Sequence, residues 1–346
     1  EGVNHPMGKE TITIIYPPSM DYNFMHQRPQ QLMKAFAQAG ANVIYINPAN
    51  IFPNVPDIVR PFKDLPNFTI VKQGVDYKHL IKGKVVIYAA VNQGKFIDET
   101  PHDLSVFDSC DLATDEFSAW KNVVPIMEQK TDLTCASAKV IYDEHIRRGV
   151  NTILVPNGAD YDHFSPAVKR LERPRDMPTV GNRFLIGYYG AIYTWLDVEL
   201  VKTIADYFPV VMIGRNNLYN IPIEHKNITS LPMKKYNELP RYLSWFDVAI
   251  IPFKLTKMIS GCDPVKCYEY LSAGKPVVAS KMQELEKFRD VVYFGDVNNI
   301  INVISQAIRE NSPDKVVARQ AIAKKNSWLS RAQYALDHFK RMLNVE

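Results

Sequence analysis

Short runs of β-branched and aromatic residues alternate along the chain with longer segments of helical periodicity, starting at Thr11. This alternation is typical of βαβ units, in which helices connect the strands of a parallel sheet. A helix is predicted over residues 29–39, because Pro29 suits a first helical turn and Gly40 suits a helix end. In the first half of the chain the pattern predicts strands at residues 11–17, 41–47, 68–72, 85–89, 104–107, 133–136 and 152–155.

A second series of strands is predicted at residues 184–189, 210–213, 228–231, 248–252, 276–280 and 291–294. The stretch between the two series is rich in proline and basic residues and has no sustained period, which favours a linker. The fold class expected is therefore α/β, with two Rossmann-like doubly wound domains facing across a cleft. The expected boundaries are residues 1–166, a linker at 167–183, a second domain at 184–329, and a terminal helix at 330–346 that packs back on the first domain.

Composition narrows the class of protein further. The 346 residues are 46% hydrophobic and 23% charged, which excludes a disordered chain or a fibrous repeat. The net charge of +4 is too small to indicate nucleic acid, although it tolerates an anionic substrate. Four scattered cysteines form no CxxC pair, so we expect reduced thiols and a cytoplasmic location. Apolar runs such as residues 248–253 are too short to span a bilayer, and residues 1–6 lack the apolar core of a signal peptide.

The segment around residues 250–280 carries the most chemical information. Asp263 and Pro264 form a helix start, and Gly274 ends a helix that would run to Ala273. A strand precedes this helix and another follows it, so its amino terminus lies at the carboxyl edge of the sheet. The free N–H groups and the dipole at that terminus favour an anion.

Two side chains of this helix fit a nucleoside diphosphate. Lys266 lies in the first turn, where it can add a point charge to a phosphate. Glu269 is three residues later on the same face, where a carboxylate can accept hydrogen bonds from both ribose hydroxyls. The alternative is a solvated ion pair on the helix surface.

The stretch DPVKCYEYLSAGKPVVAS, residues 263–280, resembles the donor-binding signature of GT-B-fold glycosyltransferases, in particular the family-four enzymes that build bacterial surface polysaccharides. This resemblance implies that Glu269 holds the ribose of a nucleotide sugar. Three other stretches are similar to the same group, so that the likeness covers nearly the whole chain: HQRPQQL at 26–32, VPNGAD at 155–160 and IGYYGA at 186–191.

The chain also departs from the family pattern at two places. Gly261 stands where family members often carry a further Glu, so Lys266 and the exposed amides around Ser260 and Gly261 are expected to replace it. A Lys that often follows the glycine turn at Gly190 is absent, and Arg215 is the candidate to supply a basic group for the diphosphate. Glycine at such a strand-to-helix turn lets the backbone approach a phosphate closely. An ordinary surface role is the alternative for Arg215.

Asp108 and Asp111 follow a predicted strand of the first domain. Two acids there fit a metal pair, a general base, or carboxylates that cap a loop. The pair is not a DxD motif and no His or Cys joins it, so no obligatory metal is expected. The resemblance implies a polar residue near this point that faces the donor sugar, with Asp111 as the first candidate for a catalytic role and Asp108 as the second.

The first loop of the chain supplies candidates for the acceptor. Asp21, Tyr22, His26 and Arg28 cluster between the first predicted strand and helix. The alternative is that His26 and Arg28 cap the helix or pair with an acid.

We therefore expect a glycosyltransferase that moves a sugar from a nucleoside diphosphate, UDP being the favoured base, to a glycan or lipid-linked glycan. The family implies retention of anomeric configuration. No cofactor beyond this donor substrate, no metal and no nucleic acid are expected. The alternatives are a nucleotide-sugar epimerase and a non-catalytic carbohydrate-binding or coat protein. The basic, amphipathic residues 315–342 fit either peripheral contact with the inner membrane face or, as we favour, a helix packed on the protein.

Overall fold

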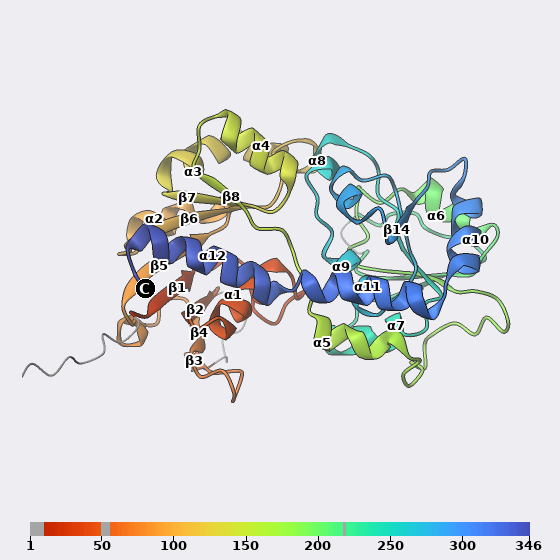
Figure 1. Ribbon diagram of the computed structural model, residues 1–346, viewed down its shortest axis with the longest axis horizontal. Coiled ribbons are helices and arrows are strands. Elements are labelled where there is room, and N and C mark those ends of the chain that lie inside the picture. Colours follow the sequence, from red (N-terminus) through yellow and green to blue (C-terminus); the bar gives the residue numbers. More distant parts are fainter. Residues whose placement is uncertain (1–9, 50–55, 217–218) are drawn as a thin grey trace, which may run out of the picture. The chain divides into compact units, whose positions relative to one another are not determined.

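The computed structural model describes residues 10–49, 56–216 and 219–346. Residues 1–6, for which the sequence predicts no signal peptide, lie outside the described residues. The chain forms two compact units (Figure 1). Unit 1 comprises the chain up to Pro156 together with Trp328–Glu346, and unit 2 comprises Asn157–Ser327. Each unit is a sheet of mostly parallel strands with connecting helices, which confirms the predicted α/β class.

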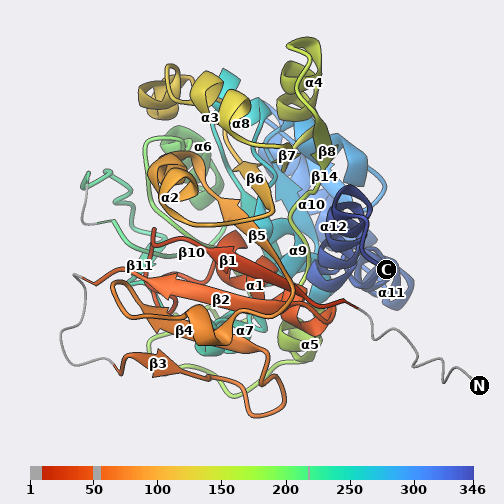
Figure 2. The ribbon, with the colours of Figure 1, turned by 90° about the vertical axis from the view of Figure 1, so that its left-hand side faces the viewer.

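Unit 1 contains an eight-stranded sheet in the order β3-β4-β2-β1-β5-β6-β7-β8 (Figure 2). All neighbours are parallel except the antiparallel pair β3 and β4. The order reverses between β1 and β5, the position at which such sheets bind ligands beyond their carboxyl ends. The strands are β1 (Ile12–Tyr16), β2 (Asn42–Asn47), β3 (Ile58–Val59), β4 (Phe68–Lys72), β5 (Lys84–Ala89), β6 (Leu104–Ser109), β7 (Leu133–Ala136) and β8 (Thr152–Leu154).

The helices of unit 1 are α1 (Arg28–Gln38), α2 (Gly94–Glu99), α3 (Val124–Lys130), α4 (Lys139–Arg147) and α12 (Trp328–Leu343). The last of these, α12, packs against α1, with the rings of Phe36 and Phe339 5.7 Å apart. Its apolar side chains, including Trp328 and Leu336, are buried. The apolar stripe of the C-terminal helix is therefore covered by protein.

Unit 2 contains a six-stranded parallel sheet in the order β11-β10-β9-β12-β13-β14. This is the 3-2-1-4-5-6 order of a dinucleotide-binding sheet, with the reversal between β9 and β12. Its strands are β9 (Ile186–Tyr189), β10 (Val210–Ile213), β11 (Ile228–Leu231), β12 (Val248–Ile251), β13 (Val277–Ala279) and β14 (Val292–Phe294). Its helices are α5 (Tyr161–Phe164), α6 (Val198–Ala205), α7 (Leu239–Leu243), α8 (Lys257–Ser260), α9 (Val265–Ser272), α10 (Ile300–Glu310) and α11 (Pro313–Lys325).

The division between the units differs from the predicted boundaries at 166, 183 and 329. Asn157 belongs to unit 2, because its backbone N–H donates to a carboxylate oxygen of Asp263 at 2.9 Å. The segment predicted as a linker, residues 167–183, also packs within unit 2: Trp245 Nε1 donates to the carbonyl of Leu171, and Tyr242 donates to Asp176. Its prolines and basic residues therefore belong to a packed surface segment.

Candidate functional site

Two glycine turns lie together at the carboxyl edge of the unit 2 sheet. Gly190 follows β9 with φ +138°, and a Cβ there would lie 2.9 Å from Cε of Lys266. Gly214 follows β10, and a Cβ there would lie 1.8 Å from the carbonyl oxygen of Gly190. The absence of side chains at both turns therefore brings backbone and the Lys266 side chain together at the point where the strand order reverses.

Helix α9 begins one residue later than predicted. Pro264 is its N-cap, without a side-chain hydrogen bond, and Gly274 with φ +66° follows its end as predicted. The N–H groups of Val265 and Lys266, its first two residues, have no acceptor within the helix. The amino end of α9 therefore presents donors at the carboxyl edge of the sheet.

The sequence predicted that Asp263 caps this helix. The structure differs, because the Asp263 carboxylate has other partners. It accepts hydrogen bonds from the backbone of Asn157 at 2.9 Å, from Tyr268 at 2.8 Å and from Lys287 at 3.0 Å. The Asn157 side chain also donates to the Asp263 carbonyl at 2.6 Å. This buried network fixes the segment that enters α9.

The Lys266 side chain packs beside aromatic rings. Its ammonium lies 5.4 Å from the ring centroid of Tyr188 and 5.0 Å from that of Phe253. Across the described parts of the chain, no acid lies within ion-pair distance of it. Burial lowers the pKa of Lys266, and the charge of Glu269 acts in the opposite direction. The Lys266 ammonium is therefore a fixed and partly desolvated cation that can bind an anion at this edge of the sheet.

Glu269 is buried at 6% exposure, so the solvated surface pair with Lys266 does not form. Tyr189 donates a hydrogen bond to its Oε2 at 2.5 Å. Burial raises the pKa of Glu269 to about 7, while the Tyr189 hydrogen bond and the Lys266 charge oppose this rise and Asp160 adds to it. Asp160 in turn accepts a hydrogen bond from Tyr236 at 2.5 Å. The structure thus holds a carboxylate with unused acceptor capacity one turn along α9 from Lys266.

The other predicted donor residues have different surroundings. The backbone N–H groups of Ser260 and Gly261 donate to Thr256 and Met258 in and around α8. They are therefore engaged, contrary to the expectation of exposed amides. Arg215 is exposed, and its carbonyl accepts from Ile192 N at 3.1 Å, which places it beside the loop that follows Gly190.

The acids predicted in unit 1 divide into a buried one and an exposed one. Asp108 follows the pattern of a structural acid: Arg28 donates to both its oxygens, at 2.9 and 2.8 Å, and Tyr88 donates at 2.7 Å. Both charged side chains are 6% exposed. These contacts occupy Asp108 and draw Arg28 into the protein, which argues against proton transfer by the first and acceptor binding by the second. Asp111 is exposed two residues after β6.

The remaining acceptor candidates lie in the loop after β1. Asp21 accepts from the backbone of Asn23 at 2.7 Å, which is a local turn. Tyr22 is buried with its ring edge-on to Tyr45, and the His26 ring stands edge-on to Tyr22. Of these three, His26 is the least buried.

Sequence reasoning missed Tyr189, Tyr236 and Lys287 as partners of the site. No signal in the sequence pairs Lys287 with Asp263 or Tyr189 with Glu269, because the partners are far apart along the chain. The VPNGAD stretch resembles the family pattern, but its contact with the start of α9, through Asn157 and Asp263, is a tertiary feature.

In residues 10–49, 56–216 and 219–346, no three His, Cys, Asp or Glu side chains gather as a metal would require. None of the helices in these same ranges has the length and apolarity needed to cross a bilayer.

Solved structures similar to this chain define the fold. Sucrose-phosphate synthase from Thermosynechococcus elongatus superposes with a TM-score of 0.68 over 97% of this chain and 100% of its own, at 15% identity. An Escherichia coli trehalose-6-phosphate structure bound with UDP-2-fluoro glucose gives a TM-score of 0.70 over 95% and 99%, at 8% identity. An α,α-trehalose-phosphate synthase (UDP-forming) from Burkholderia vietnamiensis gives 0.67 over 96% and 100%, at 11% identity. The fold is that of the GT-B glycosyltransferases, as the resemblance implied.

Sequence comparison adds one curated relative. A Bacillus subtilis (strain 168) protein named for teichuronic acid biosynthesis as the glycosyltransferase TuaH is 25% identical over 176 residues. The match covers 47% of this chain and 44% of that protein, so the chain spans less than half the length of this relative. No protein-family model matches the sequence.

Proposed function

We propose that this protein is a glycosyltransferase that uses a nucleoside diphosphate sugar, with UDP as the favoured nucleotide. The observation that carries the proposal is the placement of Lys266 and Glu269 one turn apart on α9, beside the Gly190 turn at the reversal point of the unit 2 sheet. The name of the curated relative and the UDP sugar in a structure of the same fold support it. The acceptor we propose is a glycan or lipid-linked glycan, reached in the cytoplasm or at the inner membrane face.

The donor's diphosphate binds at the amino end of α9. The N–H groups of Val265 and Lys266 donate to its oxygens, and the Lys266 ammonium adds a charge. The ribose lies further along the helix, where Glu269 accepts hydrogen bonds from its hydroxyls. Ionised Glu269 is the form that accepts two such bonds, and the Tyr189 hydroxyl favours this form because it donates to the carboxylate.

Cleavage of the sugar–diphosphate bond places negative charge on the leaving phosphate. The α9 terminus, Lys266 and Arg215 stabilise that charge without a metal, and one preorganised donor in such a site contributes roughly 2.7–4 kcal/mol. Positive charge develops at the anomeric carbon, and the reaction proceeds with retention, as the study of a trehalose-6-phosphate synthase of this fold describes for that enzyme. Exposed Asp111 is our candidate to orient or deprotonate the acceptor hydroxyl.

Acceptor recognition is assigned to unit 1. His26 is the least buried of the loop candidates, while Asp21 and Tyr22 shape the loop that carries it. Arg28 and Asp108 support this region through their buried pair.

A panel of nucleotide sugars screened by thermal shift tests the proposal. A ligand in excess stabilises the folded protein by RT ln(1 + [L]/Kd), so the true donor raises the melting temperature most. The expected result is a shift with one nucleotide sugar and its nucleoside diphosphate, lost in Glu269→Gln, followed by transfer of that sugar when candidate glycans are added. No shift with any nucleotide sugar, or an equal shift in Glu269→Gln, contradicts the proposed donor site. Release of an isomerised sugar without acceptor identifies an epimerase.

A further inference from the structure

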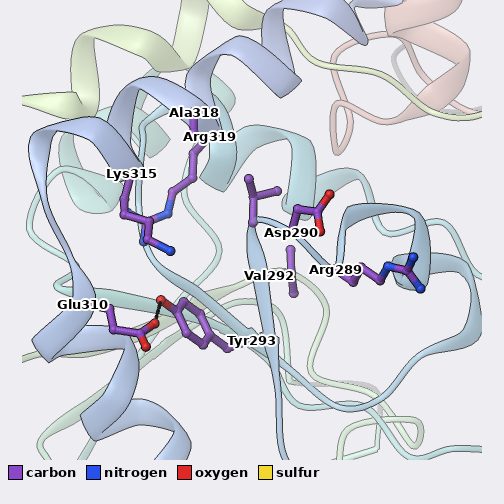
Figure 3. A pocket seen from close by; sticks show the side chains of 9 residues that line it. Arg289, Asp290, Val292, Tyr293, Glu310, Lys315, Ala318 and Arg319 are labelled. Atoms are coloured by element: carbon purple, nitrogen blue, oxygen red, sulfur yellow. Dashed lines mark hydrogen bonds between the residues drawn. The ribbon is translucent and has the colours of Figure 1, made fainter.

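A pocket lies at the opposite edge of the unit 2 sheet from Lys266 and Glu269. Val292, the first residue of β14, lines it and pairs in register with Val277, the first residue of β13. The pocket therefore lies at the amino ends of these strands, between β14, the end of α10 and the first turns of α11 (Figure 3). Its cavity volume is about 190 Å³.

Arg319 of α11 lines this pocket and is 1% exposed. Its Nη1 donates to the carbonyl of Gly274 at 3.2 Å and to Oδ1 of Asn311 at 2.7 Å. Its Nη2 is buried and has no hydrogen-bond partner in the described parts of the chain. No acid among the described residues lies within ion-pair distance of the guanidinium. A buried cation without an acid is costly, because neither water nor a counter-charge offsets its desolvation.

The other charged groups of the pocket differ in how they are engaged. Lys315 lies one turn before Arg319 on α11, exposed, and it forms no ion pair within the described chain. Glu310 accepts hydrogen bonds from Tyr293 at 2.5 Å and from Gln306 at 3.0 Å. Lys315 and Arg319 are therefore the cations here that an added anion could neutralise.

Two further charged residues lie at the rim. Arg289 points away from Arg319 in Figure 3 and donates to Glu286 at 3.3 Å. Asp290, the next residue along the chain towards β14, is an exposed acid that also lines the pocket. Its negative charge opposes an anion weakly, since exposed charges are well screened.

We propose that this pocket binds a small phosphate-bearing anion, held between the Arg319 guanidinium and the Lys315 ammonium. A guanidinium presents its donors in a fork that matches two phosphate oxygens, and one arm of this fork lacks an acceptor. Nη2 is shielded from solvent, so binding includes a local side-chain movement that brings it to the anion. The cavity is several times the roughly 30 Å³ that one water occupies in the liquid, which leaves room for phosphate and a small organic group. This site does not depend on the proposed donor site.

The test is calorimetric titration of the full chain with inorganic phosphate, at ionic strength matched with chloride. Lys315→Ala is expected to weaken the apparent phosphate affinity about tenfold, the scale of one lost charged hydrogen bond. Lys325→Ala, an exposed lysine at the far end of the same helix, is the matched control and leaves the affinity unchanged. Arg319→Lys, which keeps the charge but removes the fork, is expected to weaken it similarly; far-ultraviolet circular dichroism verifies that this variant folds.

Two further arms separate this site from the donor site and identify the source of the phosphate. Lys266→Ala leaves phosphate binding intact if the anion occupies the Arg319 pocket, whereas loss of binding in Lys266→Ala alone overturns the proposal and leaves the donor site standing. Heat from phosphate that equals heat from chloride also overturns it. A sugar phosphate that binds more tightly than free phosphate, with the same loss in Lys315→Ala, identifies a phosphorylated metabolite as the ligand; equal affinity identifies free phosphate.

Discussion

The carboxyl edges of the two sheets both place an acid near a basic residue, yet the two pairs differ in what remains available. In unit 1, Asp108 accepts two hydrogen bonds from Arg28 and another from Tyr88, so that its charge is neutralised and its oxygens are occupied. In unit 2, Glu269 accepts a hydrogen bond from Tyr189, and Lys266 contacts the rings of Tyr188 and Phe253 where Arg28 contacts an acid. The first arrangement stabilises a fold, and the second is suited to a ligand.

The same contrast recurs along α9 itself. Asp263, just before the helix, is fully buried and bound by Lys287, Tyr268 and Asn157. Six residues later Glu269 has a raised pKa, because burial is not offset by an ion pair. The structural acids Asp108 and Asp263 therefore have hydrogen bonds and a basic partner on their carboxylates, whereas Glu269, which we assign to donor binding, has no ion-pair partner among the described residues.

The unit 1 pair can be broken by Arg28→Met, which leaves the Asp108 charge buried alone. We expect a loss of about 3–5 kcal/mol in the free energy of unfolding, measured with urea. Lys95→Met, which removes an exposed pair with Glu99, is the control and should cost less than about 1 kcal/mol. A loss in Arg28→Met as small as that of the control contradicts a structural role for the pair.

The unit 2 acid can be tested through the pH dependence of stability. The pKa of Glu269 is raised from 4.5 to about 7 in the folded protein, so between these values the folded state binds more protons than the unfolded state. Stability therefore falls as pH rises through this window, by about 3 kcal/mol in full. Glu269→Gln removes this loss. The free energy of unfolding of the variant, measured with urea, therefore rises relative to that of the parent protein between pH 5 and pH 8. An equal difference at both pH values shows that Glu269 titrates normally.

The positive partner at the same edge is expected to contribute less. Lys266→Ala should weaken binding of the nucleoside diphosphate about tenfold, as expected for one charged hydrogen bond, with the fold intact. Lys226→Ala, an exposed lysine just before β11 at the opposite edge of the sheet, is the matched control. Comparable affinities for the two variants in calorimetric titration would place the diphosphate elsewhere.

The smallest expected effect concerns Tyr189. Its hydroxyl favours ionised Glu269, so Tyr189→Phe raises the pKa of that carboxyl further and leaves less of the accepting form at pH 7. Nucleotide affinity should fall about fivefold at pH 7 and recover near pH 9, since a further rise of one pKa unit changes the ionised fraction by about that factor. Exposed Tyr207→Phe should show no such recovery. A deficit independent of pH would mean that Tyr189 acts by packing alone.

Local signals explain which parts of the molecule were predictable. The strand and helix alternation predicted both sheets, and Gly274 predicted the end of α9 because a glycine readily adopts the left-handed backbone that follows a helix. Lys266 and Glu269 were found because helix spacing alone sets their separation.

Long-range pairing explains the rest. Arg28 and Asp108 are 80 residues apart, and Asn157 and Asp263 are 106 apart, so no local pattern links them. Arg28, predicted to bind the acceptor, and Asp108, predicted as a catalytic candidate, form a buried ion pair with each other. The second pair explains why the first unit ends at Pro156 and not at the predicted residue 166. It holds the segment after Pro156 against the start of α9.

The most direct test of the donor site is calorimetric titration of UDP into the parent protein and into Glu269→Ala, with Glu99→Ala as an exposed control. The account predicts one binding event for the parent and the control, and a loss of at least about a hundredfold in affinity for Glu269→Ala, since two ribose hydrogen bonds to a charged acceptor disappear together. Unchanged UDP affinity in Glu269→Ala would contradict the assignment of this carboxylate to the donor.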